Sequence, residues 1–87
     1  MRSRRSAKAR RVFGTVLRLD QHRHLLRFHN YEFGIDVVEW IEETGIGAYE
    51  VRAEMEDMEN APGYVRAIPV VVFASTDDAF AFKMRWL

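Results

Sequence analysis

The stretch that decides the fold is residues 48–74, AYEVRAEMEDMENAPGYVRAIPVVVFA. Through residues 48–59 apolar side chains alternate with charged ones, which predicts a half-buried strand, although Glu, Ala and Met make a helix the competing interpretation. The sequence NAPG at residues 60–63 predicts a turn. Residues 64–74 then predict a buried strand, in which Pro69 indicates an edge position or a bulge.

A helix follows directly from this strand. Residues 75–78, STDD, form a capping box, and the chain continues as AFAFKMRWL to residue 87. Acids in the first turn and bases in the last suit the helix dipole. Apolar side chains lie on two faces of this helix, one with Ala79, Phe82 and Trp86 and the other with Phe80, Met84 and Leu87. Such a helix must pack against more than one surface, so we expect a symmetric homodimer with this helix or a sheet edge at the contact.

A second helix is predicted upstream, in YEFGIDVVEWIEET at residues 31–44, with Asn30 as its N-cap and Gly45 at its C-terminal end. Its acids gather in one stripe about 60° wide, and apolar residues cover the broad remainder. The members of this acidic stripe are Glu32, Asp36, Glu39 and Glu43. The simplest interpretation of the stripe is a solvated helix surface.

The N-terminal third contributes two shorter strand patterns. Residues 11–19, RVFGTVLRL, and residues 24–29, HLLRFH, alternate between apolar and polar side chains, so the two segments can form a hairpin. Residues 1–10, MRSRRSAKAR, have no apolar period and predict a flexible basic arm. We therefore expect residues 11–87 to form a single α+β domain.

The order of these elements, β-β-α-β-β-α, predicts a small two-layer sandwich. In this fold an antiparallel sheet of about 3–4 strands carries two helices on one face, and a ferredoxin-like variant is compatible with the same order. A chain of 87 residues makes one domain at most. We expect its core to contain Trp40, Ile41, Val71, Phe73, Phe82 and Trp86.

Charge is sorted along the chain. Residues 1–29 hold nine of the thirteen Lys/Arg and one acid, whereas residues 30–63 hold ten of the thirteen acids and one base. A cationic arm of this kind is typical of phosphate contacts, so the first functional hypothesis is nucleic-acid binding. The candidate contact residues are Arg2, Arg4, Arg5, Lys8, Arg10, Arg11, Arg18, Arg23 and Arg27. The alternatives are a solubilising tail and an arm that folds back on the acidic helix.

Some of these arginines also have a structural interpretation. Arginines are expected to point outward from the first two strands, and glutamates from the third. The two sets are Arg18, Arg23 and Arg27, and Glu50, Glu54 and Glu56. If these strands are neighbours, the opposite charges pair across the sheet at about 0.2–1 kcal/mol each.

Three histidines, His22, His24 and His29, lie within eight residues, and Glu32 follows closely. A His-x-His sequence can direct two imidazoles toward one metal ion, but the chain has no further His or Cys to complete a site. The sequence therefore predicts polar surface histidines, without a metal or a cofactor. We find no nucleophile–base pair, no phosphate-binding Gly loop and no nucleotide motif, so we predict that the protein is not an enzyme.

The C-terminal stretch at residues 70–86, VVVFASTDDAFAFKMRW, resembles the ending of small, largely uncharacterised tailed-bacteriophage proteins. In that group an aromatic strand leads through a polar cap into a D-A-x-x-F-K-x-R-W-like helix. The matching residues are Asp78, Ala79, Phe82, Lys83, Arg85 and Trp86. Residues 24–30, HLLRFHN, and the Ile/Val/Trp helix after them are similar to the same group. The resemblance implies phage origin and the host-cell cytoplasm, and it carries over no catalytic residue.

A second functional hypothesis follows from the acidic middle of the chain and from the terminal helix. The protein would be a regulator or inhibitor that binds a host or phage protein, with carboxylates that mimic nucleic-acid phosphates or with an apolar helix face. The candidate residues are Glu32, Asp36, Glu39, Glu43, Phe80, Met84 and Leu87. A solvated surface is again the structural alternative.

The absence of cysteine fits a reducing compartment, and we expect a cytoplasmic protein. After Arg11 the apolar run is broken by Gly14, Thr15 and Arg18, which is too weak for the core of a signal peptide. No stretch of about 18 apolar residues predicts a membrane span.

Overall fold

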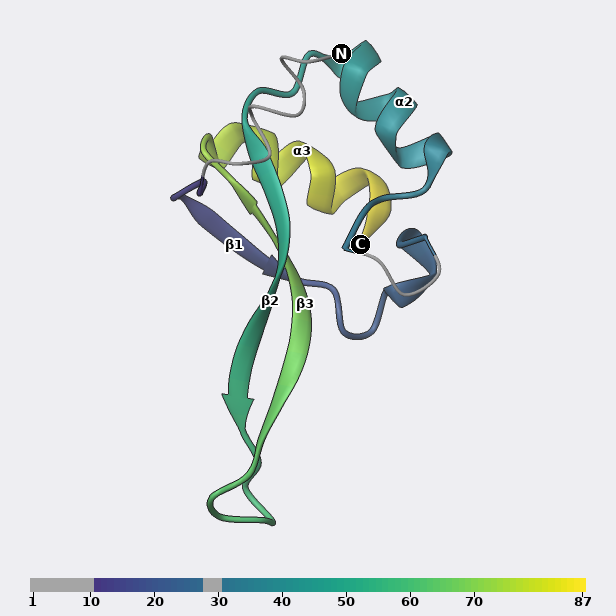
Figure 1. The fold of residues 1–87 in the computed structure, drawn as a ribbon. Helices are drawn as coiled ribbons and strands as arrows, with labels where there is room; N and C mark the ends of the chain where they lie inside the picture. Colours follow the sequence, from purple (N-terminus) through teal and green to yellow (C-terminus); the bar gives the residue numbers. More distant parts are fainter. Residues whose placement is uncertain (1–10, 28–30) are drawn as a thin grey trace.

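The computed structural model describes residues 11–27 and 31–87. The predicted arm at residues 1–10 and residues 28–30 lie outside the described residues. The elements are, in order, β1 (Thr15–Arg18), a 3-10 turn η1 (Arg23–Leu25), α2 (Ile35–Thr44), β2 (Tyr49–Asp57), β3 (Val65–Phe73) and α3 (Thr76–Trp86). An antiparallel sheet with two helices on one face confirms the predicted α+β class (Figure 1).

The three strands are arranged in the order β1-β3-β2, with β3 in the centre. The nine residues of β2 pair with the nine of β3, from Tyr49↔Phe73 to Asp57↔Val65. By contrast, β1 pairs with β3 only between Thr15↔Phe73 and Arg18↔Val70. The outer half of the β2–β3 hairpin therefore projects from the body as a two-stranded ribbon, residues 53–69 (Figure 1).

Pro69 lies in the central strand, so the prediction of an edge position is wrong. Leu19 donates its backbone N–H to the Pro69 carbonyl at 2.8 Å, so the nitrogen of Pro69 faces β1 and not β2. Because proline has no N–H, the Leu19 carbonyl receives no ladder bond from it and accepts one from the His22 N–H instead, at 2.9 Å. Proline thus ends β1 at Arg18 without removing a bond from the β2–β3 ladder.

The strand predicted at residues 24–29 is absent from the described part of the chain, where η1 occupies Arg23–Leu25. Once β1 has left the sheet, this segment has no strand edge beside it. A single bridge, Leu26↔Phe33, is all the β-structure that it makes within the described residues. The turn instead directs Leu25 into the core, where it is buried.

Helix α2 begins later than predicted. The proposed N-cap, Asn30, lies outside the described residues, and the observed N-cap is Gly34, which has no side chain to cap with. The delay arises because Phe33 is held in the bridge to Leu26 and the Gly34 N–H donates to the Leu25 carbonyl. The C-terminal end agrees with the prediction, since Gly45 adopts a left-handed conformation with φ of 80°.

Both helices cover the same face of the sheet, and the core lies between the two layers. Phe82 of α3 is fully buried at its centre, with ring centroids of Phe33 and Phe73 each 5.3 Å away. Of the six predicted core residues, Ile41, Val71, Phe73 and Phe82 are buried. Trp40 and Trp86 are half-buried and close the rim of this core, with ring centroids 6.2 Å apart in a T-shaped pair.

The predicted cap of α3 is confirmed. The Asp78 N–H donates to the Ser75 hydroxyl at 3.4 Å, and the Asp78 carboxylate accepts the Gly47 N–H at 2.9 Å. The cap therefore also ties the start of α3 to the loop before β2. At the opposite edge, Gly14 sits so close to β3 that an added Cβ would lie 2.0 Å from the Phe73 carbonyl oxygen.

Candidate interaction surfaces

The face of the sheet that carries no helix is closed by charged side chains. Ile68, Val70 and Val72 of β3 point to this face, yet they expose only 6%, 1% and 0% of their surface. In the strand register Val70 lies between Arg18 of β1 and Arg52 of β2. The aliphatic stems of arginine can cover apolar surface. The Arg18 side chain keeps 48% of its surface exposed, whereas that of Arg52 keeps only 17%.

Arg18 forms one half of this cover. Its Nη1 lies 3.1 Å from Oε2 of Glu56, and its Nη2 lies 2.8 Å from Oδ2 of Asp20. Glu56 also accepts from Arg66, whose Nη2 is 3.0 Å from Oε1. These contacts join all three strands, because Arg18, Glu56 and Arg66 belong to β1, β2 and β3 respectively.

Arg52 forms the other half. It donates to both glutamates that flank it on β2, to Oε1 of Glu50 at 3.0 Å and to Oε2 of Glu54 at 2.8 Å. It also donates to the Val12 carbonyl at 3.1 Å, while the Val12 N–H donates to Glu50 at 2.9 Å. The segment before β1 is therefore tied across the sheet to β2, and Val12 packs on the buried β3 side chains.

These contacts shift the titration of the carboxylates. The hydrogen bond from Arg18 lowers the pKa of Asp20, and hydrogen bonds from Arg66 and then Arg18 lower the pKa of Glu56. For Glu50, burial favours the neutral acid, but the Val12 N–H and Arg52 together outweigh it and the pKa is lowered. The arginines respond in the opposite sense: the pKa of Arg18 is raised first by Asp20, and that of Arg52 first by Glu54.

The predicted cross-sheet pairing is confirmed for Arg18 and Glu56, although β1 and β2 flank β3 and are not neighbours. It is wrong for Arg23 and Arg27. Arg23 belongs to η1 and Arg27 follows it, so neither projects from a strand, and neither side chain forms an ion pair within the described residues.

The structure separates the nine candidate nucleic-acid contacts into three groups. Arg2, Arg4, Arg5, Lys8 and Arg10 lie outside the described residues. Arg18 is held by two carboxylates, and Arg11 lies 4.0 Å from Glu50. Arg23 and Arg27 make up the third group, and neither forms an ion pair within the described residues. Residues 1–10 contain five of the thirteen Lys/Arg and none of the thirteen acids, so the rest of the chain has eight bases against thirteen acids, a net charge of −5.

The predicted acidic stripe is exposed. Asp36, Glu39 and Glu43 lie on α2, and Glu32 precedes the helix. Asp36 is in the first turn, where a carboxylate suits the positive end of the helix dipole, and its Oδ1 accepts the Val37 N–H at 2.9 Å. These positions are those of an ordinary solvent-facing stripe.

The second face of α3 is exposed as well. Phe80 and Met84 expose 63% and 70% of their surface, and Leu87 at the end of the helix is also exposed. No described segment covers these three residues, which we call the α3 stripe. The expectation that this face packs on a second surface is therefore not met within the described part of the chain, and packing on a second copy stays a prediction.

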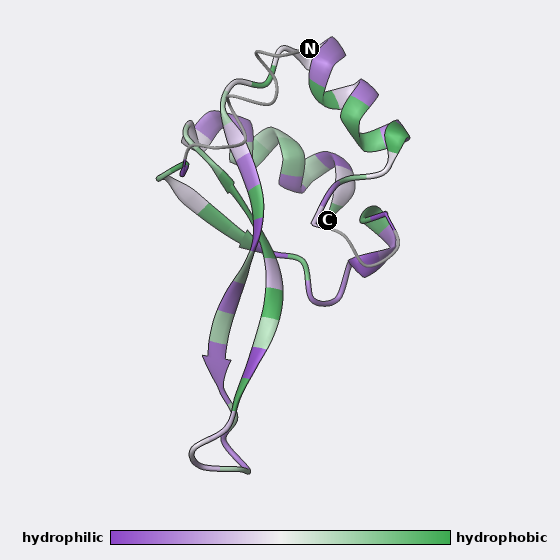
Figure 2. Ribbon diagram, in the orientation of Figure 1, coloured by the Kyte–Doolittle hydropathy of each residue, from purple (hydrophilic) through white to green (hydrophobic). Residues whose placement is uncertain are grey.

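A further exposed apolar group lies on the ribbon, and the sequence interpretation missed it. Met55, Tyr64 and Val65 expose 65%, 69% and 51% of their surface. Apolar and charged residues alternate along the β2 strand of the ribbon, whereas the β3 strand has a single charged residue there, Arg66 (Figure 2). The sequence did contain a signal for this exposure, which is the length of the strand patterns. The patterns at residues 48–59 and 64–74 are longer than the one at residues 11–19, so a strand of that shorter length cannot pair along the whole hairpin.

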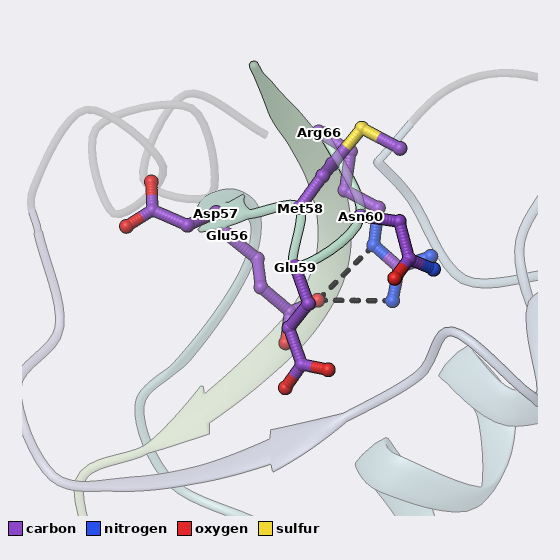
Figure 3. A pocket seen from close by; sticks show the side chains of 6 residues that line it. All are labelled: Glu56, Asp57, Met58, Glu59, Asn60 and Arg66. Carbon is purple, nitrogen blue, oxygen red and sulfur yellow. Dashed lines mark hydrogen bonds and ion pairs between the residues drawn. The ribbon is translucent and has the colours of Figure 1, made fainter. Parts of the chain in front are cut away.

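The tip of the ribbon encloses an open hollow of about 300 Å³ (Figure 3). Its lining residues are Glu56, Asp57, Met58, Glu59, Asn60 and Arg66. Glu56 and Arg66 are joined to each other, while the carboxylate of Asp57 points away from that pair (Figure 3). Asp57 and Glu59 form no ion pair with any other described residue, which leaves the tip acidic.

The histidines do not assemble a metal site in the described residues. His22 and His24 have ring centroids 6.0 Å apart, and His29 lies outside the described residues. No group of three or more His, Cys, Asp or Glu residues that could hold a metal ion occurs in residues 11–27 and 31–87.

In the same parts of the chain, no helix has the length and apolar character needed to cross a membrane.

Comparison of the chain with protein-family models, with curated proteins and with solved structures finds no match.

Proposed function

We propose that this chain is a small, non-enzymatic accessory protein that binds another protein, and that the β2–β3 ribbon is its docking element. The observation that supports this proposal is the exposure of Met55, Tyr64 and Val65 on a ribbon that projects from the body. Among residues 11–27 and 31–87, no helix or third strand lies beside the outer halves of β2 and β3.

A two-stranded ribbon is marginally stable by itself and gains stability when another surface covers it. Full burial of one large apolar side chain is worth about 1.5–3 kcal/mol, so three exposed side chains represent a substantial unused driving force for binding. Methionine adapts its shape to a partner, which suits Met55 for an interface.

The charge of the ribbon indicates the chemistry of the partner. Its outermost acids, Asp57 and Glu59, make no ion pair with another described residue, whereas its one base, Arg66, is paired with Glu56. A complementary surface would be apolar at its centre and basic at its rim. This agrees with the hypothesis of a regulator of a host or phage protein, but it moves the contact from α2 to the ribbon.

Site-specific photo-crosslinking tests the proposal. A photoreactive phenylalanine analogue in place of Tyr64 should label one defined protein in an extract of the producing cell. The same analogue in place of Tyr31, an exposed tyrosine remote from the ribbon in sequence, is the matched control and should not label it. Excess unlabelled chain should compete, and a Met55→Ser/Val65→Ser double variant should not. Equal labelling from both positions, or equal competition by the variant, would contradict ribbon docking.

Nucleic-acid binding through the basic arm is a second candidate function. The observation that favours it is the charge segregation, since residues 1–10 carry five bases without an acid while the remaining chain is at −5. The folded part would repel phosphates, so any contact would depend on the arm and on neighbouring Arg11.

Deletion of residues 2–11 tests this candidate. If the six bases contact phosphates, the full chain binds duplex DNA with a log–log salt slope of at most about −5, and the deletion flattens the slope. Arg18→Met is the matched control, because that guanidinium is already paired with Asp20 and Glu56. Binding that survives the deletion, or no binding by the full chain at low salt, would exclude the arm as a nucleic-acid contact.

A further inference from the structure

The two edges of the sheet differ in chemistry. Strand β2 has an ionic side chain at every second position through most of its length, in the order Glu50, Arg52, Glu54 and Glu56. Strand β1 has the sequence TVLR, and its single charge is neutralised by Asp20 and Glu56. Charged side chains protect a strand edge from pairing, whereas β-branched and aliphatic ones favour it. The β1 edge is therefore the unprotected one.

The backbone of β1 has groups available for such pairing. Because the Leu19 N–H donates to Pro69 of β3, the alternation of the strand turns the N–H and C=O groups of Val16 and Arg18 to the outer side. Within the described parts of the chain, no other segment pairs with them. Val16 itself is about half exposed.

The α3 stripe borders the same edge. The Thr76 hydroxyl at the start of α3 lies 3.1 Å from the Thr15 hydroxyl of β1. Phe80 follows Thr76 by four residues and Leu87 follows Phe80 by seven, so both continue along the side of α3 that is nearest β1. The opposite side of α3 is directed to α2, because Phe82 and Trp86 contact Trp40 (Figure 1).

We propose that the β1 edge and the α3 stripe together form the contact of a symmetric homodimer. With the two-fold axis perpendicular to the sheet, β1 pairs antiparallel with β1 of the second copy and the two sheets become one. The same axis keeps all helices on one face and lays α3 antiparallel beside α3 of the second copy. The exposed side chains of Phe80 and Met84 then meet their counterparts across the axis.

Charge complementarity indicates a second copy and not an unrelated chain. The first turn of α3 carries Asp77, and the last turn carries Lys83 and Arg85. In an antiparallel pair, Asp77 of each copy lies toward the basic end of α3 of the other, and the two helix dipoles oppose each other. This surface is self-complementary, because a single two-fold axis matches the strand edge, the apolar stripe and the charges of α3 with those of the second copy.

This dimer leaves the ribbon free. The ribbon begins beyond Arg18↔Val70, where β1 has ended, and its outer edge is β2. The dimer proposal therefore does not rest on the proposed function, and each surface can be disrupted separately.

Light scattering of the full chain across a micromolar concentration series tests the dimer. We expect a mass of twice 10.2 kDa for the wild-type chain. Met84→Glu should raise the dimer dissociation constant by at least about tenfold, because it places a carboxylate at the apolar contact. Met55→Glu is the matched control, since Met55 is as exposed as Met84 but lies on the ribbon, and it should remain dimeric.

A second variant tests the strand pairing. Val16→Pro removes an N–H that faces the outer edge, so it should weaken the dimer while far-UV circular dichroism stays unchanged. A wild-type chain that is monomeric throughout the series overturns the proposal, as does a Met84→Glu chain that dimerises normally. Dissociation by Met55→Glu, or unweakened dimerisation of a folded Val16→Pro chain, likewise overturns this geometry.

Discussion

The Nη1 atom of Arg18 on β1 lies 3.1 Å from Oε2 of Glu56 on β2, although β3 separates the two strands. The bond spans the central strand on the face that carries no helix, where Ile68 and Val70 are buried. A side-chain pair thus takes the place of a covering helix, and it helps to bury residues 68–73 of the central strand on both faces.

The role of Arg18 as a cover predicts a difference between two substitutions. Arg18→Ala removes both the charge and the stem, whereas Arg18→Met keeps most of the stem. We therefore expect Arg18→Ala to lower Tm clearly more than Arg18→Met. Thermal denaturation followed by circular dichroism measures both. Equal losses would show that the ion pairs, and not the covering of Val70, account for the contribution of Arg18.

The carboxylates of this network predict a loss of stability in acid. Their folded-state pKa values lie below the ordinary 3.8 of Asp20 and 4.5 of Glu50 and Glu56, so the unfolded chain binds more protons in this range. Their stabilisation is complete above the ordinary values and is lost as the pH falls through the folded-state values. Denaturant titrations from neutral pH down to about pH 2 should show this decline. Glu56→Gln should make it shallower, and an unchanged slope in that variant would argue against the pairing.

The position of Phe82 predicts the largest effect of a single truncation. Phe82→Ala leaves a cavity between both layers and should lower the free energy of unfolding by about 3–5 kcal/mol. Trp86→Phe is an informative contrast, because it keeps an aromatic ring and removes a buried indole N–H that has no hydrogen-bond partner in the described structure. It should cost much less. Similar losses in urea denaturation would place the centre of the core elsewhere.

The close approach at Gly14 predicts that this glycine resists substitution. In Gly14→Ala the new methyl group would lie 2.0 Å from a backbone oxygen of β3, so the β1–β3 contact must shift, at about 1–3 kcal/mol. Gly47→Ala is the control, since its nearest contact would be 3.5 Å from the Asp78 carboxylate. Urea denaturation of both variants should show a loss for Gly14→Ala only. A Gly14→Ala chain as stable as the wild type would mean that β1 lies farther from β3.

The candidate site was only partly predictable from the sequence. Periodicity identified the α3 stripe, because the exposed positions follow from the helical repeat and from the number of available packing surfaces. The exposure of Met55, Tyr64 and Val65 on the ribbon was missed. Met55 alternates with glutamates as an inward-facing residue would, and Tyr64 and Val65 begin the segment predicted to be a buried strand. They are exposed because β1 ends at Arg18 and no helix of the described structure reaches the outer hairpin. The sequence of the hairpin alone cannot predict how far the neighbouring elements extend.

The sequence by itself determined the local elements: the Ser75 cap of α3, the left-handed Gly45 that ends α2, and the alternation of β2. These features depend on the dihedral preferences of single residues and on contacts between side chains a few residues apart, so the local sequence is enough to predict them. Only the tertiary structure decided that β3 is central, with Pro69 inside it, and that residues after β1 form a turn and not a strand. The reason is physical. The side-chain pattern of a strand fixes which of its faces is apolar. It does not fix the neighbouring strand, because backbone N–H and C=O groups are chemically the same at every strand edge. Strand order depends instead on which packed arrangement leaves the fewest of those groups unpaired.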